Sequence, residues 1–208
     1  MKKLFLLVIL TCFSFLLKGQ TFQDSLLISQ KTKIIGFSPS KKSQNINGVL
    51  IKYFDEIDTE ISPKKVNGIG FGVNPLGVFF PILVLVSIPE IDKWSFDEIG
   101  STAIPEKMNK INGLQLSIVN MEPTVTNGLE VNVSSNLGAP SVINGLAISP
   151  LFNLHHTQKG VAIATFANVG AKCRGLQIGL INNCSDMKGL QIGFWNKNGK
   201  RSFPIINF

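Results

Sequence analysis

Histidine, cysteine, tyrosine and tryptophan are scarce in this chain of 208 residues, which has two His, three Cys, one Tyr and two Trp. So few histidines and cysteines leave little material for a zinc site or for a catalytic triad. No Gly-x-Ser-x-Gly elbow is present, and no run of basic residues is longer than two. The sequence therefore predicts a protein that is not an enzyme, holds no cofactor or metal, and does not bind nucleic acid.

The N-terminus has the pattern of a secretory leader. Lys2 and Lys3 precede a hydrophobic run from Leu4 to Leu17. This run falls short of the ~20 apolar residues that a membrane-spanning helix needs. We therefore expect residues 1–20 to be a signal peptide rather than a transmembrane anchor. Cys12 is a poor site for lipid attachment, because a threonine precedes it and apolar residues continue after it.

The rest of the chain is organised as one domain after a short polar segment. We expect a polar arm, or a first strand, at residues 21–44 and a single β-repeat domain at residues 45–208. Residues 76–88 form its most apolar stretch, which Pro81 interrupts, and they predict a strand that is buried or faces lipid. Residues 89–110 predict an irregular excursion. Without the leader, basic residues outnumber acidic ones by four.

One short motif recurs six times between Asn112 and Asn196. It consists of a Gly, then alternating apolar and small or polar residues, and usually a final Asn; the clearest copies are residues 175–182 and 189–196. The motif glycines are Gly113, Gly128, Gly145, Gly160, Gly175 and Gly189, and clear motif asparagines are Asn120, Asn182 and Asn196. Glycine spacings of 14 to 17 residues indicate a repeat architecture, with looser copies upstream at Gly48 and Gly68.

Within each copy the apolar residues alternate with period two, which indicates β-strands. In the copy at residues 175–182, Leu176, Ile178 and Leu180 project to one side, and Gln177 and the glycines project to the other. A helix is excluded because these apolar residues would not share a stripe. The strip of Gly and Gln has two readings. It admits close approach by a glycan, peptide or sheet, or it simply lets neighbouring strands pack closely.

Two all-β arrangements satisfy this pattern. The first is an antiparallel meander of about ten strands that closes into a barrel-like sheet, with its aliphatic face toward outer-membrane lipid. The alternative is a β-solenoid or roll that buries the same face. Variable copy spacing favours hairpin loops and hence the meander, whereas the shortage of Tyr and Trp for interfacial girdles counts against it. We prefer the antiparallel meander.

The remaining polar clusters do not form a recognisable site. We expect His155 and His156 on a surface loop, since adjacent histidines of a strand point in opposite directions and no ligand partners are evident. The acids of residues 55–60 lack the spacing of a calcium loop and predict a solvated turn. The glycines of residues 68–72 lack the strand-helix context of a phosphate loop and read as repeat glycines.

We expect Cys173 and Cys184 to be free thiols. An extended strand between them would hold the two ends about 30 Å apart. A disulfide needs Cα atoms within about 7 Å of each other.

The copies resemble bacterial surface-repeat proteins built from tandem Gly-Leu-Gln-Ile-Gly-Leu-Ile/Tyr-Asn units, over about residues 109–208. The middle copies depart from that pattern, because Glu130, Ala147 and Ala162 replace the Gln. The resemblance implies export to the outer membrane or cell surface of a Gram-negative bacterium and brings no catalytic residues. We therefore expect a non-enzymatic envelope protein with outer-membrane lipid as candidate partner. The alternative is a soluble secreted or periplasmic binding or adhesion protein. Its protein or glycan ligand is unknown.

Overall fold

The computed structural model describes residues 32–38, 45–53, 63–74, 79, 108–136, 141–199 and 201–208. These residues form one sheet of ten strands that pair in sequence order. The strands are β1 (Lys33–Ser38), β2 (Asn45–Lys52), β3 (Lys65–Gly72), β4 (Asn109–Asn120), β5 (Thr124–Asn136), β6 (Val142–Ser149), β7 (Phe152–Ala164), β8 (Ala167–Ile178), β9 (Ile181–Asn198) and β10 (Arg201–Asn207). The predicted signal peptide, the acids of residues 55–60 and most of residues 76–107 lie outside the described residues.

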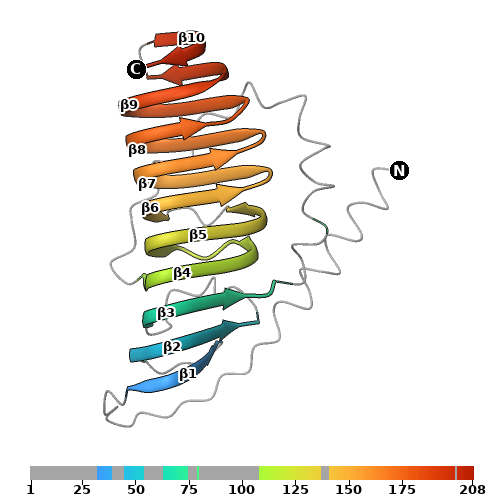
Figure 1. Ribbon diagram of the computed structural model, residues 1–208, viewed down its shortest axis with the longest axis vertical. Helices are drawn as coiled ribbons and strands as arrows, with labels where there is room; N and C mark the ends of the chain where they lie inside the picture. The colour runs from blue at the N-terminus through green and yellow to red at the C-terminus, as the bar shows by residue number, and fades with distance from the viewer. Residues whose placement is uncertain are drawn as a thin grey trace, which may run out of the picture.

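Strands β1 to β9 pair in parallel and wind into a β-solenoid of about seven turns (Figure 1). Each circuit of the chain is called a rung below. The all-β class is confirmed, but the antiparallel barrel-like meander is wrong, and the solenoid alternative describes the fold. Each motif glycine pairs with the glycine of the next copy. The extra residues of the longer spacings therefore lie between the paired segments. The same tolerance of variable length was expected of hairpin loops in the meander.

A column of eight glycines fixes this parallel register: Gly48, Gly68, Gly113, Gly128, Gly145, Gly160, Gly175 and Gly189. Their φ angles lie between 123° and 150°, a region that other residues rarely adopt. A Cβ on any of them would lie 1.9–2.3 Å from a backbone carbonyl oxygen of the preceding rung. In seven cases that oxygen belongs to the preceding glycine of the column, so only glycine allows identical rungs to stack here.

The sequence pattern assigned residues correctly to the two faces of each strand. The solenoid alternative, however, expected the aliphatic face to be buried, and this orientation is wrong. Gln177 and Gln191 are buried in the interior, whereas Leu176 and Ile178 face outward and are partly exposed. The interior accepts polar side chains because identical amides at the same height in successive rungs hydrogen-bond to one another. Apolar interior clusters are small: Ile46, Leu50, Val66 and Ile111 form one, and Phe152, Leu154, Ala167 and Val169 form another.

Cys173 and Cys184 form a disulfide, so the expectation of two free thiols is wrong. Their Cα atoms are 6.4 Å apart although the residues are 11 positions apart in sequence. The chain does not run straight between them, because it completes most of a rung. Cys184 pairs with Gly170 of β8, and the register then skips Ala171. The bridge therefore links two successive rungs inside the solenoid, where Met187 packs against it.

The last strand closes the C-terminal end of the stack. β10 turns back and pairs antiparallel with β9. Its register shifts between Phe203 and Ile205, and Ile205 has a φ of 68°. At the other end β1, which falls in the segment predicted as a polar arm or first strand, pairs in parallel with β2.

Candidate functional site

Asparagines at matching positions of successive rungs line one corner of the interior, and we call them the inner asparagine column: Asn120, Asn136, Asn153, Asn168, Asn182 and Asn196. All six are fully buried. Asn153 donates to Asn168 at 3.0 Å, Asn168 to Asn182 at 2.8 Å, and Asn182 to Asn196 at 2.8 Å. The same amide nitrogens also donate to main-chain carbonyls, for example Asn168 to Ile178. The motif asparagines Asn182 and Asn196 thus hold rungs together, whereas the buried amide of Asn120 has no hydrogen-bond partner among the described residues.

Glutamines form a second buried ladder. Gln177 donates to Gln158 at 3.0 Å, and Gln191 donates to Gln177 at 2.9 Å. Further toward the N-terminus the ladder is interrupted, since Ala147 and Ala162 occupy the Gln177 position in β6 and β7. Gln115 occupies the same position in β4, and its amide has no hydrogen-bond partner among the described residues. Such an orphaned buried amide weakens this part of the stack.

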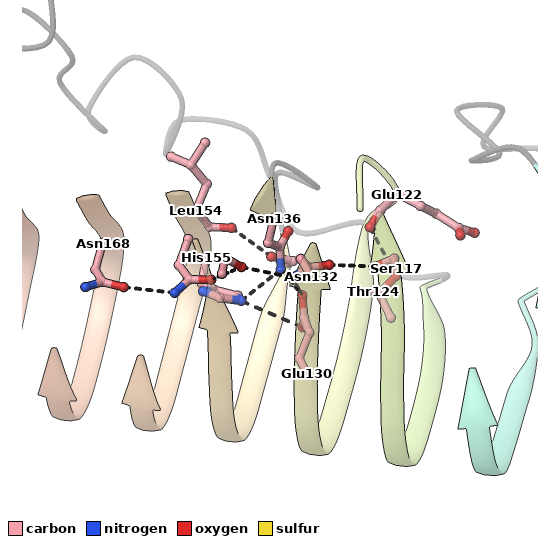
Figure 2. A network of polar contacts seen from close by, with 12 residues as sticks. Ser117, Glu122, Thr124, Glu130, Asn132, Asn136, Leu154, His155 and Asn168 are labelled. Atoms are coloured by element: carbon pink, nitrogen blue, oxygen red, sulfur yellow. Dashed lines mark hydrogen bonds and ion pairs between the residues drawn. The ribbon is translucent and has the colours of Figure 1, made fainter. Parts of the chain in front are cut away.

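A buried ionisable cluster lies where Glu130 replaces the glutamine (Figure 2). His155 Nε2 is 3.8 Å from Glu130 Oε2 and 2.9 Å from Asn136 Nδ2. Asn132 and Asn136 both donate to Glu130 Oε1. Burial raises the pKa of the Glu130 carboxyl, but the neighbouring His155 and the Asn132 amide outweigh burial and lower the pKa below its ordinary 4.5. The carboxylate is therefore charged at neutral pH.

The cluster connects to both neighbouring parts of the interior. Ser117 donates to Asn132 at 2.5 Å, and Asn132 donates to Ser149 at 3.1 Å. Ser149 donates to Asn153, which starts the continuous part of the inner asparagine column. Figure 2 shows this chain of bonds running along the solenoid axis.

A second buried charge pair lies toward the N-terminal end. Lys52 Nζ is 3.0 Å from Glu122 Oε2, and the two side chains are 1% and 4% exposed. Asn109 also donates to Glu122, and its own Oδ1 accepts from the Lys64 backbone NH. Each charge is therefore matched by an opposite charge or an amide, as burial in a protein interior requires.

The histidines do not lie on a surface loop, which corrects the sequence-based expectation. Both belong to β7, and they point in opposite directions as adjacent strand residues do. His155 is 2% exposed in the interior. His156 is half-buried beside Thr157, and burial followed by the charge of Lys172 lowers its pKa. Within the described part of the chain, no group of His, Cys, Asp and Glu could hold a metal ion.

The outer surface carries two continuous aliphatic columns, one and three residues after the motif glycines. The first contains Val49, Ile69, Leu114, Leu129, Leu146, Val161, Leu176 and Leu190, and the second contains Ile51, Phe71, Leu116, Val131, Ile148, Ile163, Ile178 and Ile192. These side chains are partly exposed; Phe71 is 43% and Ile192 37% exposed. The column members lie in register on one face of the stack. Neither column was recognised from the sequence as an outward-facing surface of a solenoid.

The residues that directly precede the motif glycines form a further outward column. This column consists of Asn in β2 to β6 and of Lys or Arg in β7 to β9. Asn47, Asn67, Asn112, Asn127 and Asn144 form a hydrogen-bonded ladder with donor–acceptor distances of 2.7 Å. Lys159, Arg174 and Lys188 take the same position in β7 to β9, and we call these three residues the basic column. The signal was visible in sequence, because Asn-Gly becomes Lys-Gly or Arg-Gly in the last three copies.

Charge on the described surface is almost entirely positive. Nine basic side chains are exposed or partly exposed: Lys33, Lys65, Lys110, Lys159, Lys172, Arg174, Lys188, Lys197 and Arg201. Among the described residues Asp186 is the one exposed acid. Arg174 Nη2 donates to Asp186 Oδ2 at 2.6 Å, and this bond lowers the pKa of the Asp186 carboxyl. Most acids of the chain lie in segments outside the described residues.

The glycines of residues 68–72, excluded above as a phosphate loop, belong to one rung. Gly68 lies in the glycine column. Gly70 and Gly72 point into the interior, next to Gln115 and Ser117 of β4. This placement agrees with their interpretation as repeat glycines. Within the strip of Gly and Gln, Gln177 and Gln191 are buried in the interior, whereas Gly175 and Gly189 are exposed and contact the backbone of the preceding rung.

Comparisons with family models, curated proteins and solved structures found no match for this chain. In the described residues no helix has the length and hydrophobicity to cross a membrane.

Proposed function

We propose that this chain is a non-enzymatic protein of the bacterial cell envelope, exported to the outer membrane or cell surface, where it serves as an elongated binding scaffold. The observation that carries the proposal is the pair of outward aliphatic columns, which continue across eight strands. Eight strands at about 4.8 Å spacing span roughly 35 Å. Contiguous apolar patches of this length on a soluble domain mark a surface that meets a partner or a membrane.

The interior supports a structural role for the polar residues. Glu130 and His155 are at most 2% exposed, so no solute reaches them without opening the stack. Their hydrogen bonds connect rung to rung. The resemblance to tandem surface-repeat proteins and the leader-like N-terminus favour export. Together these features favour a scaffold over an enzyme.

Fractionation of a Gram-negative host that expresses the full-length chain tests this function. We expect the chain in the envelope fraction, with release by detergent but not by washing with buffer. Recovery in the aqueous periplasmic or secreted fraction without detergent would contradict envelope attachment. It would favour the soluble binding or adhesion protein instead.

A matched pair of variants tests whether the aliphatic columns are the surface responsible. Ile178→Thr combined with Ile192→Thr removes two members of the second column and keeps β-branched side chains that suit a strand. Ile34→Thr combined with Ile205→Thr makes the same change at two isoleucines that are 76% and 70% exposed outside the columns. We expect only the first pair to shift the chain into the aqueous fraction. Equal behaviour of the two pairs would contradict a role for the columns.

A further inference from the structure

We infer that the outer face of β7, β8 and β9 docks onto an anionic lipid surface, with the basic column against the phosphate headgroups and the aliphatic columns against the upper acyl region. This inference rests on the proposed envelope function and assigns its partner. It requires that the cations be outward, that they border the apolar columns, and that nearby acids be too few to cancel them.

The orientation of the basic column follows from the burial of its neighbours. In β8, Cys173 and Gln177 are buried, and they flank the segment that contains Arg174 and Leu176. Arg174, Leu176 and Ile178 alternate with Cys173, Gly175 and Gln177 and face outward; Gly175, which has no side chain, is itself exposed. The same alternation holds in β9, where Met187 and Gln191 are buried and Lys188, Leu190 and Ile192 are exposed.

The basic column borders the first aliphatic column with only the glycine column between them. Lys159, Arg174 and Lys188 each precede a motif glycine, and Val161, Leu176 and Leu190 follow it. Parallel pairing sets the three cations about 4.8 Å apart along the stack. Lys172, two residues before Arg174, adds a further exposed charge on the side of the basic column away from the aliphatic residues. Long basic side chains beside an apolar strip suit a lipid interface, because their stems lie along apolar surface while their charges reach the headgroups.

Charge and shape together favour a lipid layer over other anionic partners. Asp186 is the single exposed acid in the described residues, against nine exposed or partly exposed basic side chains. Asp186 pairs with Arg174, so Lys159 and Lys188 supply the net charge of the basic column. That excess attracts any polyanion. A soluble polyanion, however, would leave the adjoining aliphatic columns in water. Binding at a lipid interface instead gains from both buried apolar area and attraction to anionic headgroups.

Vesicle co-sedimentation of the purified chain, as recovered from the exporting host, tests the inference. We expect binding to vesicles that contain phosphatidylglycerol and little binding to pure phosphatidylcholine vesicles, with affinity falling as salt rises. Lys159→Asn combined with Lys188→Asn should weaken binding about 25-fold, at roughly fivefold for each lost charge. Asparagine already stacks at this position in five rungs, so the fold tolerates the change.

Lys33→Asn combined with Lys197→Asn is the matched control, since it removes the same charge from exposed sites outside the basic column. This control should bind within about threefold of the unchanged chain, because neither residue belongs to the basic column and salt partly screens exposed charges. Circular dichroism and thermal unfolding of both pairs establish that the variants fold.

Three outcomes overturn the inference while the envelope function stands: equal binding to neutral and anionic vesicles, equal losses in the two variant pairs, or binding to dextran sulfate as tight as to anionic vesicles. Absence of vesicle binding by a chain that fractionates with the envelope also overturns the inference alone. Aqueous recovery in the fractionation experiment, in contrast, overturns the function on which it rests.

Discussion

At the scale of single residues, glycine is required once in every rung because two adjacent rungs approach through their backbones. The φ of Gly145 is 144°, and a Cβ on this residue would lie 1.9 Å from the carbonyl oxygen of Gly128. Neither backbone segment has a side chain that could move away. A methyl group at this position therefore separates two rungs or forces the glycine out of its φ region.

We predict that Gly145→Ala destabilises the protein by about 2–4 kcal/mol, because it combines a strained φ with an overpacked backbone contact. Gly72→Ala is the matched control. A Cβ on Gly72 would meet Ser117 Cβ at 3.1 Å, and the φ of Gly72 is not in the positive region. We expect the control to change stability by no more than about 1 kcal/mol. Denaturant unfolding compares them, and equal losses would contradict the role assigned to the glycine column.

Ionisation of the buried Glu130 carboxyl affects the stability of the interior. Its pKa is lower in the folded protein than its ordinary value of 4.5. A depressed folded pKa contributes stability that is present above pH 4.5 and is lost as the pH falls through the folded pKa. This stabilising contribution requires the charged carboxylate, so Glu at position 130 provides it and Gln does not.

Glu130→Gln should consequently cost stability at pH 7, and the difference from the unchanged chain should narrow as pH falls below about 4.5. Gln fits sterically, because Gln115 and Gln177 occupy the same inward position in their own rungs. Urea unfolding of both chains across this pH range measures the difference. A difference that stays constant with pH would mean that the Glu130 charge has no special role.

At the scale of strands and rungs, the disulfide fastens β8 to β9 from the inside. The bridge closes a loop with a sequence separation of 11 residues. Chain-entropy estimates give about 3 kcal/mol for a loop of this length. Neighbouring glutamine and asparagine ladders already connect the same two strands, so the bridge supplements existing bonds.

We predict that Cys173→Ala combined with Cys184→Ala lowers the free energy of unfolding by about 2–3 kcal/mol without abolishing the fold. Added reductant should reproduce the loss in the unchanged chain and have no effect on the double variant. Amide hydrogen exchange should speed up mainly in β8 and β9, with β4 to β6 less affected. Uniformly faster exchange along the stack would show that the rungs unfold as one unit.

For the strands, the sequence predicted their positions and their two faces but not the direction of pairing. Period-two alternation around Leu176 and Gln177 located the strands and separated their faces correctly. Strand direction was missed, because the pattern of one copy is the same in parallel and antiparallel stacks. The φ of the glycine column and its contacts decide this, and both depend on the neighbouring rung.

The other wrong predictions at the site concern residues that are distant in sequence, because each rung closes on itself and brings such residues together. A straight strand would hold Cys173 and Cys184 apart, but the chain bends at residues 179–180, between β8 and β9, and brings them together. His155 looked exposed because its partner Glu130 is 25 positions away in sequence. The outward basic column was readable in principle, since Lys159, Arg174 and Lys188 all precede motif glycines. Its significance required knowing that the rungs stack in register.

At the scale of the whole molecule, the C-terminal end of the stack is protected by β10. This strand covers the last parallel edge at β9 by reversing direction, and Pro204 within it cannot donate a ladder hydrogen bond. Open edges of parallel stacks recruit further strands, and solenoids need such terminal caps for solubility.

Deletion of residues 201–208 should therefore expose β9 and cause concentration-dependent association. Size-exclusion chromatography with light scattering should show larger species for the truncated chain than for the intact one at equal concentration. Replacing Phe203 and Phe208 with Ser keeps the strand while reducing its apolar surface. Association caused by those substitutions alone would indicate that the cap acts through its aromatic side chains rather than through strand pairing.

Because identical glycines stack between successive rungs, the gene can gain or lose a whole rung while the other rungs stay as they are. Each rung makes its contacts chiefly with the rungs directly before and after it. Unequal recombination between two copies would insert or remove one complete layer and leave every remaining interface intact. Each event would alter the length of the rod by about 4.8 Å. The length of the stack thus becomes a property that evolution can adjust in discrete steps, without redesign of the layers themselves.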